Sequence, residues 1–439
     1  MVTFNAIPED WGFQPIGDYV EKMVGGAPLK PSDFSTSGVR VIPKKAVQFG
    51  GKIHFDIKTF CTSEFAESNK RNVVDNQFLI TTLRDLVPSG PTIGVIGVLS
   101  EKGSFILAQG VYGLKTKNVD DGYLAQVSNT SWYRGEMRKV FVGSTQVHIR
   151  NQEFLDVKIP FPEQQKIAAI LTSVDEVIEK TQAQIDKLKD LKTAMMQELL
   201  LPSEKSGVGT KQSAAALSNS ERYIPHTEFK DSPVGRIPKS WGVVPLESLV
   251  KADKKITYGI VQAGPHCEGG VPYIRVSDMS SRHLTKKGML LTSSDIAKKY
   301  ERSAVCAGDI VYALRGMIGH VHIVPSELEG ANLTQGTARI SPSEAINTNY
   351  LLWAMRSPYV TLQNELEAKG STFKEVTLAS LRKMQIAVPS DSEQQFISAT
   401  LSSIELKIFA VEDKLEQSKL LKKALMQDLL TGKVRVKLD

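Results

Sequence analysis

Cysteine is scarce in this chain of 439 residues, which contains only Cys61, Cys267 and Cys306. They lie far apart and none belongs to a C-x-x-C pair, so neither a disulfide framework nor a zinc site is indicated. This usage favours a reducing, cytoplasmic compartment. The sequence also lacks a run of the about 20 apolar residues that a membrane helix needs. Its first residues, MVTFNAIPEDWGF, do not have the basic and apolar segments of a secretion signal.

Catalytic motifs are missing as well. The chain has no G-x-G-x-x-G, no G-x-x-x-x-G-K-[ST] and no H-E-x-x-H. It has no G-x-S-x-G elbow and no D/N-P-P-Y/F run of the kind that an amino-methyltransferase carries. The seven histidines are scattered, and those of HVH (320–322) are expected to point outward from a strand. We therefore expect binding or scaffolding, with no catalytic residue, metal site or cofactor in the chain itself.

Charge and composition leave several classes of partner open. The net charge is +6 and the isoelectric point is about 8.9, which is compatible with nucleic acid but not diagnostic of it. Hydrophobic residues make up 41% of the chain, so each half can bury a sizeable core. The length predicts two to four domains.

The chain contains a long internal repeat. EQQKIAAIL (163–171) returns 230 positions later as EQQFISATL (393–401), and 16 of the 38 aligned positions of 163–200 and 393–430 are identical. Shorter matches precede it in the same order, among them IPEDWGFQPIGDYV (7–20) with IPKSWGVVPLESLV (237–250) and ILAQG (106–110) with NLTQG (332–336). The unit of about 230 residues is too long for a solenoid repeat, so we expect duplication of a whole module.

Each copy is expected to be a mixed α/β domain followed by a long helix. Short β-rich runs at 92–99, 308–314 and 319–325 are bounded by glycine and proline. Helical spacing predicts one helix over 349–366, with its counterpart over roughly 122–140. The polar segment 202–220 is typical of a flexible linker, and residues 223–241 are expected to form an extended arm.

The two long helices carry a coiled-coil seam of about five heptads. In the first helix the seam is interrupted by Thr181 and Lys192, and in the second by Ser418 and Lys422. Two matching helices in one chain most simply pair with each other, antiparallel if the halves are related by a two-fold axis. The alternatives are that each helix packs on its own domain, or that the seam joins two chains. The apolar seam residues are Ile167, Leu171, Val174, Ile178, Ile185, Leu188, Met195, Leu199, Ile397, Leu401, Ile404, Ile408, Val411, Leu415, Leu425 and Leu429.

A family resemblance rests on the helix pattern E-Q-x-x-I, preceded by a proline and present twice, each time after a variable α/β domain. With VPYIRVSDM (271–279), GDIVYALRGMIG (308–319) and the connector 223–241, the chain resembles the specificity subunit of type I restriction-modification systems. The resemblance covers essentially the whole chain. The first domain departs from the pattern, because QFLITTLRDLVPSG (77–90) stands where the second domain has its G-D-I-V-x-A-x-R-G run.

The resemblance implies α/β (α+β) target-recognition domains in two pseudo-symmetric copies, joined by two long antiparallel coiled-coil helices. The expected boundaries are domain 1 at 1–160, the central helix at 161–201, a linker and connector at 202–236, domain 2 at 237–390, the C-terminal helix at 391–431 and a tail at 432–439. Each domain would read one half of a split, asymmetric site in double-stranded DNA, and the coiled coil would set the spacer.

The resemblance also implies partners. Two methyltransferase subunits would dock and methylate adenine N6 with S-adenosylmethionine, and motor-nuclease subunits that use ATP and Mg would join them. The subunit itself would bind no cofactor and would act in the cytoplasm, away from membranes. The repeated E-Q-Q segments are the expected docking points: Glu163, Gln164, Gln165, Glu393, Gln394 and Gln395.

Comparison of the copies provides a filter for DNA-binding residues. Polar residues shared by both domains should serve the frame or the phosphates, and residues that differ should carry base identity. A structural hydrogen bond for Arg315, and turns with a helix cap for the Gly-Ser-Thr loops, are the alternatives. The glycine beside each shared glutamine is expected to serve a tight turn. The shared pairs are Arg84 with Arg315, Gln109 with Gln335, Ser144 with Ser371 and Thr145 with Thr372.

Further candidates are specific to one copy. In domain 2, Tyr273, Arg275 and Ser277 would share one face of an extended strand, although an ordinary solvated strand face is the alternative. Arginine could bind guanine there, and aspartate could accept from cytosine N4. The remaining candidates are Lys254, Lys255, Tyr258, Asp278 and Lys374 in domain 2, and Lys44 and Lys45 in domain 1.

Two other functions remain open from the sequence. The chain could be the DNA-recognition part of another restriction system or of a solitary methyltransferase system. It could also be a coiled-coil scaffold that does not read DNA.

Overall fold

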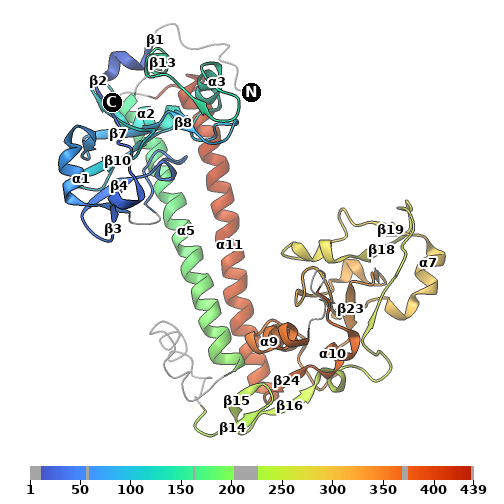
Figure 1. The fold of residues 1–439 in the computed structure, drawn as a ribbon. Helices are drawn as coiled ribbons and strands as arrows, with labels where there is room; N and C mark the ends of the chain where they lie inside the picture. Colours follow the sequence, from blue (N-terminus) through green and yellow to red (C-terminus); the bar gives the residue numbers. More distant parts are fainter. Residues whose placement is uncertain (1–10, 56–58, 162–163, 202–225, 368–373, 437–439) are drawn as a thin grey trace. The chain divides into compact units, whose positions relative to one another are not determined.

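The computed structural model describes residues 11–55, 59–161, 164–201, 226–367 and 374–436. The chain divides into two compact units. Unit 1 comprises residues 1–183 and 412–439, and unit 2 comprises residues 184–411. Each unit therefore combines one α/β domain with segments of both long helices (Figure 1). Among the described residues, no helix is long and apolar enough to cross a membrane.

The domain of unit 1 is built on two small sheets, with strand orders β2-β11-β7-β9 and β3-β5-β4-β10-β6. Strand β7 is buried on both faces, because Leu79 packs in one hydrophobic core and Ile80 in the next. Two short pairs, β1 with β13 and β8 with β12, complete the domain. The strands are β1 (Gly12–Pro15), β2 (Val20–Gly25), β3 (Phe34–Ser35), β4 (Val39–Ile42), β5 (Phe60–Cys61), β6 (Val73–Val74), β7 (Phe78–Thr82), β8 (Arg84–Asp85), β9 (Ile96–Val98), β10 (Phe105–Leu107), β11 (Val111–Thr116), β12 (Val147–His148) and β13 (Lys158–Phe161).

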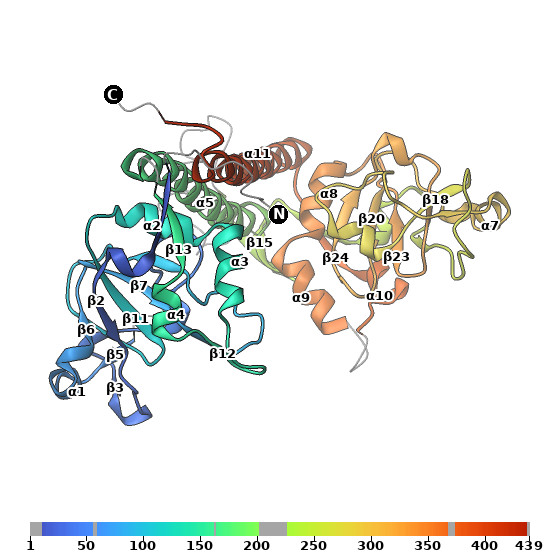
Figure 2. The same ribbon diagram turned by 90° about the horizontal axis from the view of Figure 1, so that it is seen from above.

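Two helices of this domain begin at side-chain caps. Asp120 caps α2 (Asp121–Ser128) by accepting from the backbone N–H of Tyr123, and Thr130 caps α3 (Ser131–Lys139) in the same way. Helix α2 lies beside the long helix α5, as Figure 2 shows, and both contribute to one core. The other short helices of the domain are α1 (Ser63–Ser68) and α4 (Asn151–Leu155).

Unit 2 repeats this design. Its sheets have the orders β17-β23-β20-β21 and β19-β18-β22, and the pair β16–β24 corresponds to β1–β13. Its strands are β14 (Phe229–Ser232), β15 (Gly235–Pro238), β16 (Gly242–Pro245), β17 (Thr257–Tyr258), β18 (Val271–Ile274), β19 (Leu291–Thr292), β20 (Ile310–Ala313), β21 (Val321–Ile323), β22 (Asn332–Leu333), β23 (Thr337–Ile340) and β24 (Gln385–Val388). Its short helices are α7 (Ser294–Lys299), α8 (Thr348–Met355), α9 (Pro358–Glu367) and α10 (Leu378–Lys383).

Individual hydrogen bonds recur in the two units. The Tyr123 hydroxyl donates to the Pro160 carbonyl at 2.7 Å, and the Tyr350 hydroxyl donates to the Ala387 carbonyl at 2.8 Å. Each unit also contains one parallel strand pair, β4 with β10 and β18 with β22. The predicted fold class, two mixed α/β copies connected through long packed helices, is confirmed.

Three local expectations were wrong. The segment 349–366 is not one helix, because α8 ends at Met355 and α9 begins at Pro358, whose ring disfavours helical continuation. Its counterpart at 122–140 is also two helices, because α2 ends at Ser128 and Thr130 caps the start of α3. The described part of the connector is not a single extended arm. Its strands β14 and β15 fold back on each other as an antiparallel hairpin.

The long helices are α5 (Gln164–Leu200) and α11 (Asp391–Leu430). In unit 1, Ile167 and Leu171 near the start of α5 share a core with Leu429 near the end of α11. In unit 2, Leu199 near the end of α5 shares a core with Ile397 near the start of α11. The helices therefore pair antiparallel, and all predicted seam positions are buried or half-buried.

The lysines that interrupt the seam form matched ion pairs. Lys192 Nζ lies 2.7 Å from Glu405 Oε1 in unit 2, and Lys422 Nζ lies 2.6 Å from Asp175 Oδ1 in unit 1. Each residue of one pair is the repeat equivalent of a residue in the other, 230 positions away. Each helix therefore supplies a lysine to one pair and a carboxylate to the other.

Candidate nucleic-acid interface

A groove of about 1180 Å³ crosses the surface of the unit 2 domain. Its lining comes from the residues after β18, the residues after β20 and the turn between β22 and β23, together with residues 260–263 and 374–375. The first three are ends of neighbouring strands, so residues distant in sequence meet here. Of the sequence candidates, Arg275, Ser277, Arg315, Gln335 and Lys374 line the groove.

Arg315 is exposed at the end of β20, where the backbone bridges to Glu375. A Cβ atom at Gly336 would lie 2.9 Å from Arg315 Nε and 3.0 Å from Val276 Cγ2. Gly336 therefore leaves the room in which the arginine side chain lies. The expectation that this glycine serves a tight turn holds for its counterpart Gly110, which has φ +85°. Gly336 does not have a positive φ, so its role is steric.

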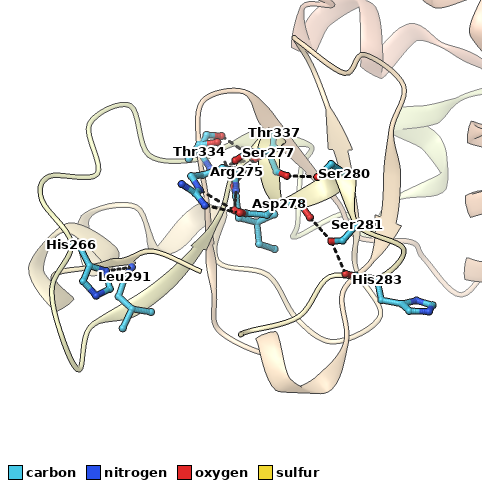
Figure 3. A network of polar contacts seen from close by, with 11 residues as sticks. His266, Arg275, Ser277, Asp278, Ser280, Ser281, His283, Leu291, Thr334 and Thr337 are labelled. Carbon is cyan, nitrogen blue, oxygen red and sulfur yellow. Dashed lines mark hydrogen bonds and ion pairs between the residues drawn. The ribbon is translucent and has the colours of Figure 1, made fainter. Parts of the chain in front are cut away.

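Arg275 does not lie on a strand, because β18 ends at Ile274 and a short 3₁₀ helix, Val276–Ser280, follows. Its guanidinium forks onto Asp278, with Nε 3.1 Å and Nη2 2.7 Å from the two carboxylate oxygens (Figure 3). The hydrogen bond to Asp278 raises the pKa of Arg275. Asp278 is therefore engaged with Arg275 rather than available to a cytosine, and the ion pair holds the arginine at the edge of the groove.

The other candidates of domain 2 lie outside the groove lining, and some of them are buried or already contact another side chain of the protein. Tyr273 is buried, which overturns the expectation that it shares an exposed face with Arg275 and Ser277. Lys254 Nζ lies 3.0 Å from Cys306 Sγ, and this contact raises the pKa of Lys254. Lys255 is exposed and Tyr258 is half-buried on β17. Ser371 and Thr372 lie outside the described residues.

A second cavity, of about 630 Å³, continues the groove toward α11. The two share Ile318, His320 and Lys374. At the far end Arg282 lies over the ring of Phe409, with its Cζ 4.8 Å from the ring centroid. Of the HVH histidines, His320 is exposed, but His322 is half-buried with Nε2 3.0 Å from the Met279 carbonyl, so only His320 points outward as expected.

Unit 1 gathers the equivalent residues at the equivalent place. A Cβ atom at Gly110 would lie 2.8 Å from Lys44 Cε and 3.4 Å from Arg84 Cβ, so the two cations flank this glycine. Burial, and then the charge of Arg84, lower the pKa of Lys44. Gln109 and Lys45 are exposed beside them.

The Gly-Ser-Thr loop of unit 1 borders the same surface. Ser144 and Thr145 are exposed, and the loop leads into β12, which pairs with β8 at Arg84. The filter by shared polar residues therefore selected residues that the fold brings together in unit 1. It did not identify Lys44 as a neighbour of Gly110, because β4 and β10 are far apart in sequence.

The E-Q-Q segments have internal contacts at the second copy. Glu393 accepts from Trp241 Nε1 at 3.1 Å and from the Ser390 hydroxyl at 2.7 Å, and its carboxylate lies 2.8 Å from His226 Nε2. Gln394 is buried, accepting from the Asn347 N–H and donating to the Pro389 carbonyl. These side chains hold the helix start against the domain, whereas Gln395 is exposed.

At the first copy, Gln165 is exposed. Glu163 and the side chain of Gln164 lie outside the described residues. Among the residues that are described, no group of histidine, cysteine, aspartate and glutamate side chains could hold a metal ion.

Two equivalent cationic surfaces on a duplicated α/β framework with paired helices define a duplicated nucleic-acid-binding protein. The chain belongs to the family of the type I restriction modification DNA specificity domain, whose model matches residues 8–190 and 238–418. It is a specificity subunit, the non-catalytic component that recognises the DNA target in a type I restriction-modification complex.

Relatives extend over nearly the whole chain. The type I restriction enzyme MjaVIII specificity subunit of Methanocaldococcus jannaschii is 28% identical over 98% of this chain and 94% of its own length. The fold is similar to the crystal structure of the S subunit from M. genitalium, with 14% identity, a TM-score of 0.59 and coverage of 96% of both chains. A chain from a structural study of complex assembly in the type I R-M system gives a TM-score of 0.50 at 16% identity, over 98% of this chain and 100% of that one.

Proposed function

We propose that this subunit recognises a bipartite, asymmetric DNA site, with one half read by each unit. The observation that carries the proposal is the equivalence of the two surfaces, Lys44, Arg84 and Gln109 in unit 1 and Arg275, Arg315 and Gln335 in unit 2. Arginine and glutamine both form bidentate hydrogen bonds with base edges in the major groove. The surfaces share a frame but differ in their other residues, which fits two different half-sites.

The antiparallel helices would set the unspecified spacer between the half-sites. Their register is held by apolar seam residues and by the ion pairs Lys192–Glu405 and Lys422–Asp175. Paired helices are stiff, so a fixed register favours one spacing. Two methyltransferase subunits that act on adenine N6 would dock on the chain, with motor-nuclease subunits beside them. The repeated helix starts offer two equivalent docking regions, in which Gln165 and Gln395 are exposed.

Co-expression with a type I methyltransferase subunit that assembles with this chain, followed by mapping of methylated adenines, tests the proposal. We expect two short motifs separated by a fixed number of unspecified base pairs. Single-residue variants at Arg84 and at Arg315 should each relax only one of the motifs. A continuous motif, or adenine methylation without sequence preference, would contradict the bipartite assignment.

A further inference from the structure

Unit 1 exposes three large apolar side chains near its cationic surface. Phe49, Leu86 and Val87 are 50%, 64% and 44% exposed, and we refer to them as the apolar rim. Burying the exposed part of each such side chain against an apolar partner would be favourable. Isolated exposed leucines are common on protein surfaces, so the meaning of the rim depends on how it is held and on its neighbours.

The loop that carries Leu86 and Val87 is anchored at both ends. At its start, Asp85 Oδ1 accepts from the backbone N–H groups of Leu86 at 2.7 Å and Val87 at 3.4 Å. At its end, the buried guanidinium of Arg134 donates to the carbonyls of Gly90 at 2.8 Å and Pro91 at 3.0 Å. The same arginine also donates to the Ile93 carbonyl. The loop therefore holds its apolar residues outward.

Phe49 is positioned by the same helical segment. Its ring centroid lies 5.8 Å from Arg134 Cζ, so Phe49 is beside the base of the Leu86 loop. The next residue, Gly50, donates its N–H to the Asn129 side chain at 2.9 Å. Asn129 is the C-cap of α2 and Arg134 belongs to α3, so both loops are fixed to consecutive elements.

The rim directly follows the cations of the surface along both chain segments. Leu86 is two residues after Arg84, a reach of at most about 7 Å, and Phe49 is five residues after Lys44. The cations would contact DNA phosphates. A side chain that projects beside those cations would then face the base edges in the DNA groove. The charge of Lys44, Lys45 and Arg84 therefore points to DNA as the occupant of this surface.

Among the described residues of unit 2, the segment that follows Arg315 exposes no large apolar side chain, and the groove is bordered by one such residue from another segment, Val261, which is 52% exposed. After Arg315 the chain continues with Gly316, Met317 and Ile318, and both apolar residues are half-buried in the groove wall. The Leu86 loop of unit 1 is also longer than this segment. The rim is therefore a feature in which the two copies differ, as expected for a determinant of only one half-site.

We propose that the apolar rim reads A·T pairs in the half-site of unit 1 by packing against thymine methyl groups. The C5-methyl is the apolar feature of the major-groove edge, and aliphatic or aromatic side chains are its usual partners. The inference rests on the proposed bipartite function and specifies a chemical feature that one unit recognises.

The test compares the complex of wild-type chain and methyltransferase with a Leu86→Ser, Val87→Ser variant, using selection from a randomised DNA library. We expect the variant to lose preference at one or two A·T pairs of one half-site and to keep the other half-site. In wild type, replacing thymine by uracil at those pairs should weaken binding about fourfold per methyl group. The variant should not distinguish thymine from uracil.

A matched control is Leu362→Ser with Leu366→Ser, two exposed leucines of α9 in unit 2 that are 55% and 78% exposed and do not line the groove. This control should select the wild-type motif. Unchanged preference in the rim variant, equal weakening on all sequences, relaxation at G·C pairs, or loss of methyltransferase assembly would each overturn the inference. If wild type itself selects no bipartite motif, the proposed function fails instead.

Discussion

At the residue scale, the groove of unit 2 depends on side chains that position one another. Asp278 binds the Arg275 guanidinium, and Gly336 leaves space for Arg315. An arginine that is already held loses less side-chain entropy when it meets a base or phosphate than a free one does. Residues that never touch DNA can therefore change affinity by moving an arginine.

Gly336→Ala tests this dependence. The added Cβ would lie 2.9 Å from Arg315 Nε, so the side chain must move, and we expect DNA affinity to fall about tenfold, the effect of losing one good base contact. Fluorescence anisotropy with a DNA duplex containing the mapped site measures it. Gly242→Ala is the control, because a Cβ there would meet only the Val388 carbonyl, at 3.9 Å. Equal affinities of the two variants for DNA would show that Gly336 does not position Arg315 for DNA binding.

Salt dependence separates phosphate contacts from the general positive charge. Replacing Lys44 and Lys45 with glutamine should reduce the slope of log affinity against log salt by up to about 1.8, because each phosphate contact contributes about 0.9. Replacing Lys298 and Lys299, exposed at the end of α7 and outside the groove lining, removes the same charge. We expect a smaller change in slope there, as measured by titration in increasing salt. If both double variants changed the slope equally, the net charge of the protein alone would determine the salt dependence of DNA binding.

At the element scale, the seam of the helix pair combines apolar packing with two ion pairs. Asp175 and Lys422 have side-chain exposures of 11% and 14%, and Asp175 also accepts from Gln126 Nε2 at 2.7 Å. Removing one partner of a buried pair leaves an uncompensated charge, whereas the net stabilisation by the intact pair is small. Its main effect is to disfavour registers in which the lysine has no partner.

A double-mutant cycle measures this coupling. Asp175→Lys alone should lower the free energy of unfolding by about 3 kcal/mol, because two lysines then face each other in a mostly buried site. Adding Lys422→Asp should recover most of that loss, since the Gln126 amide can flip and offer its oxygen to the new lysine. Urea unfolding of Asp175→Lys, of Lys422→Asp and of the double variant gives the three changes in the free energy of unfolding. Additive losses would show that the two side chains do not interact.

Acidification should weaken the other pair. Burial alone would raise the pKa of Glu405, but the hydrogen bond from Lys192 and the charge of Arg356 outweigh it, so the pKa is lowered. A carboxylate with a lowered folded-state pKa contributes stability above its unfolded pKa, and that stability is lost as pH falls through the folded value. The urea midpoints of wild type and of Glu405→Gln should differ at neutral pH. They should converge as the pH falls below the ordinary glutamate pKa of 4.5. A difference independent of pH would contradict this.

At the scale of the whole molecule, the duplicated chain has two DNA-reading domains, and the pair of long helices connects them. Each helix crosses from one unit into the other, between Ala183 and Gln184 in α5 and between Val411 and Glu412 in α11. A change of helix length therefore affects the distance along the pair without altering either groove.

Insertion of one heptad at both crossing points tests the spacer hypothesis. Seven residues add about 10.5 Å of helix, which corresponds to about three base pairs of DNA at about 3.4 Å each. We expect both motifs to persist with a spacer longer by about three base pairs, as read by methylation mapping. A heptad inserted in α11 alone should abolish activity, because the seam no longer matches. Altered half-site sequences would contradict the hypothesis.

The sequence by itself determined the duplication, the two long helices and their seam, because repeats and heptads are local patterns that survive without knowledge of the fold. It also selected Arg84, Arg315, Gln109 and Gln335, since comparing two copies substitutes for comparing relatives. Local rules failed at 349–366, where helical spacing concealed the break before Pro358.

Only the tertiary structure decided which of the candidates meet. It paired Arg275 with Asp278, buried Tyr273, and gave Glu393 and Gln394 internal partners. It also joined Lys192 to Glu405, although the sequence showed only that a lysine interrupts the seam. Such contacts link residues up to more than 200 positions apart, and they depend on strand order and helix register. For that reason a pattern read along the chain predicts the frame of this protein but not the chemistry of its surface.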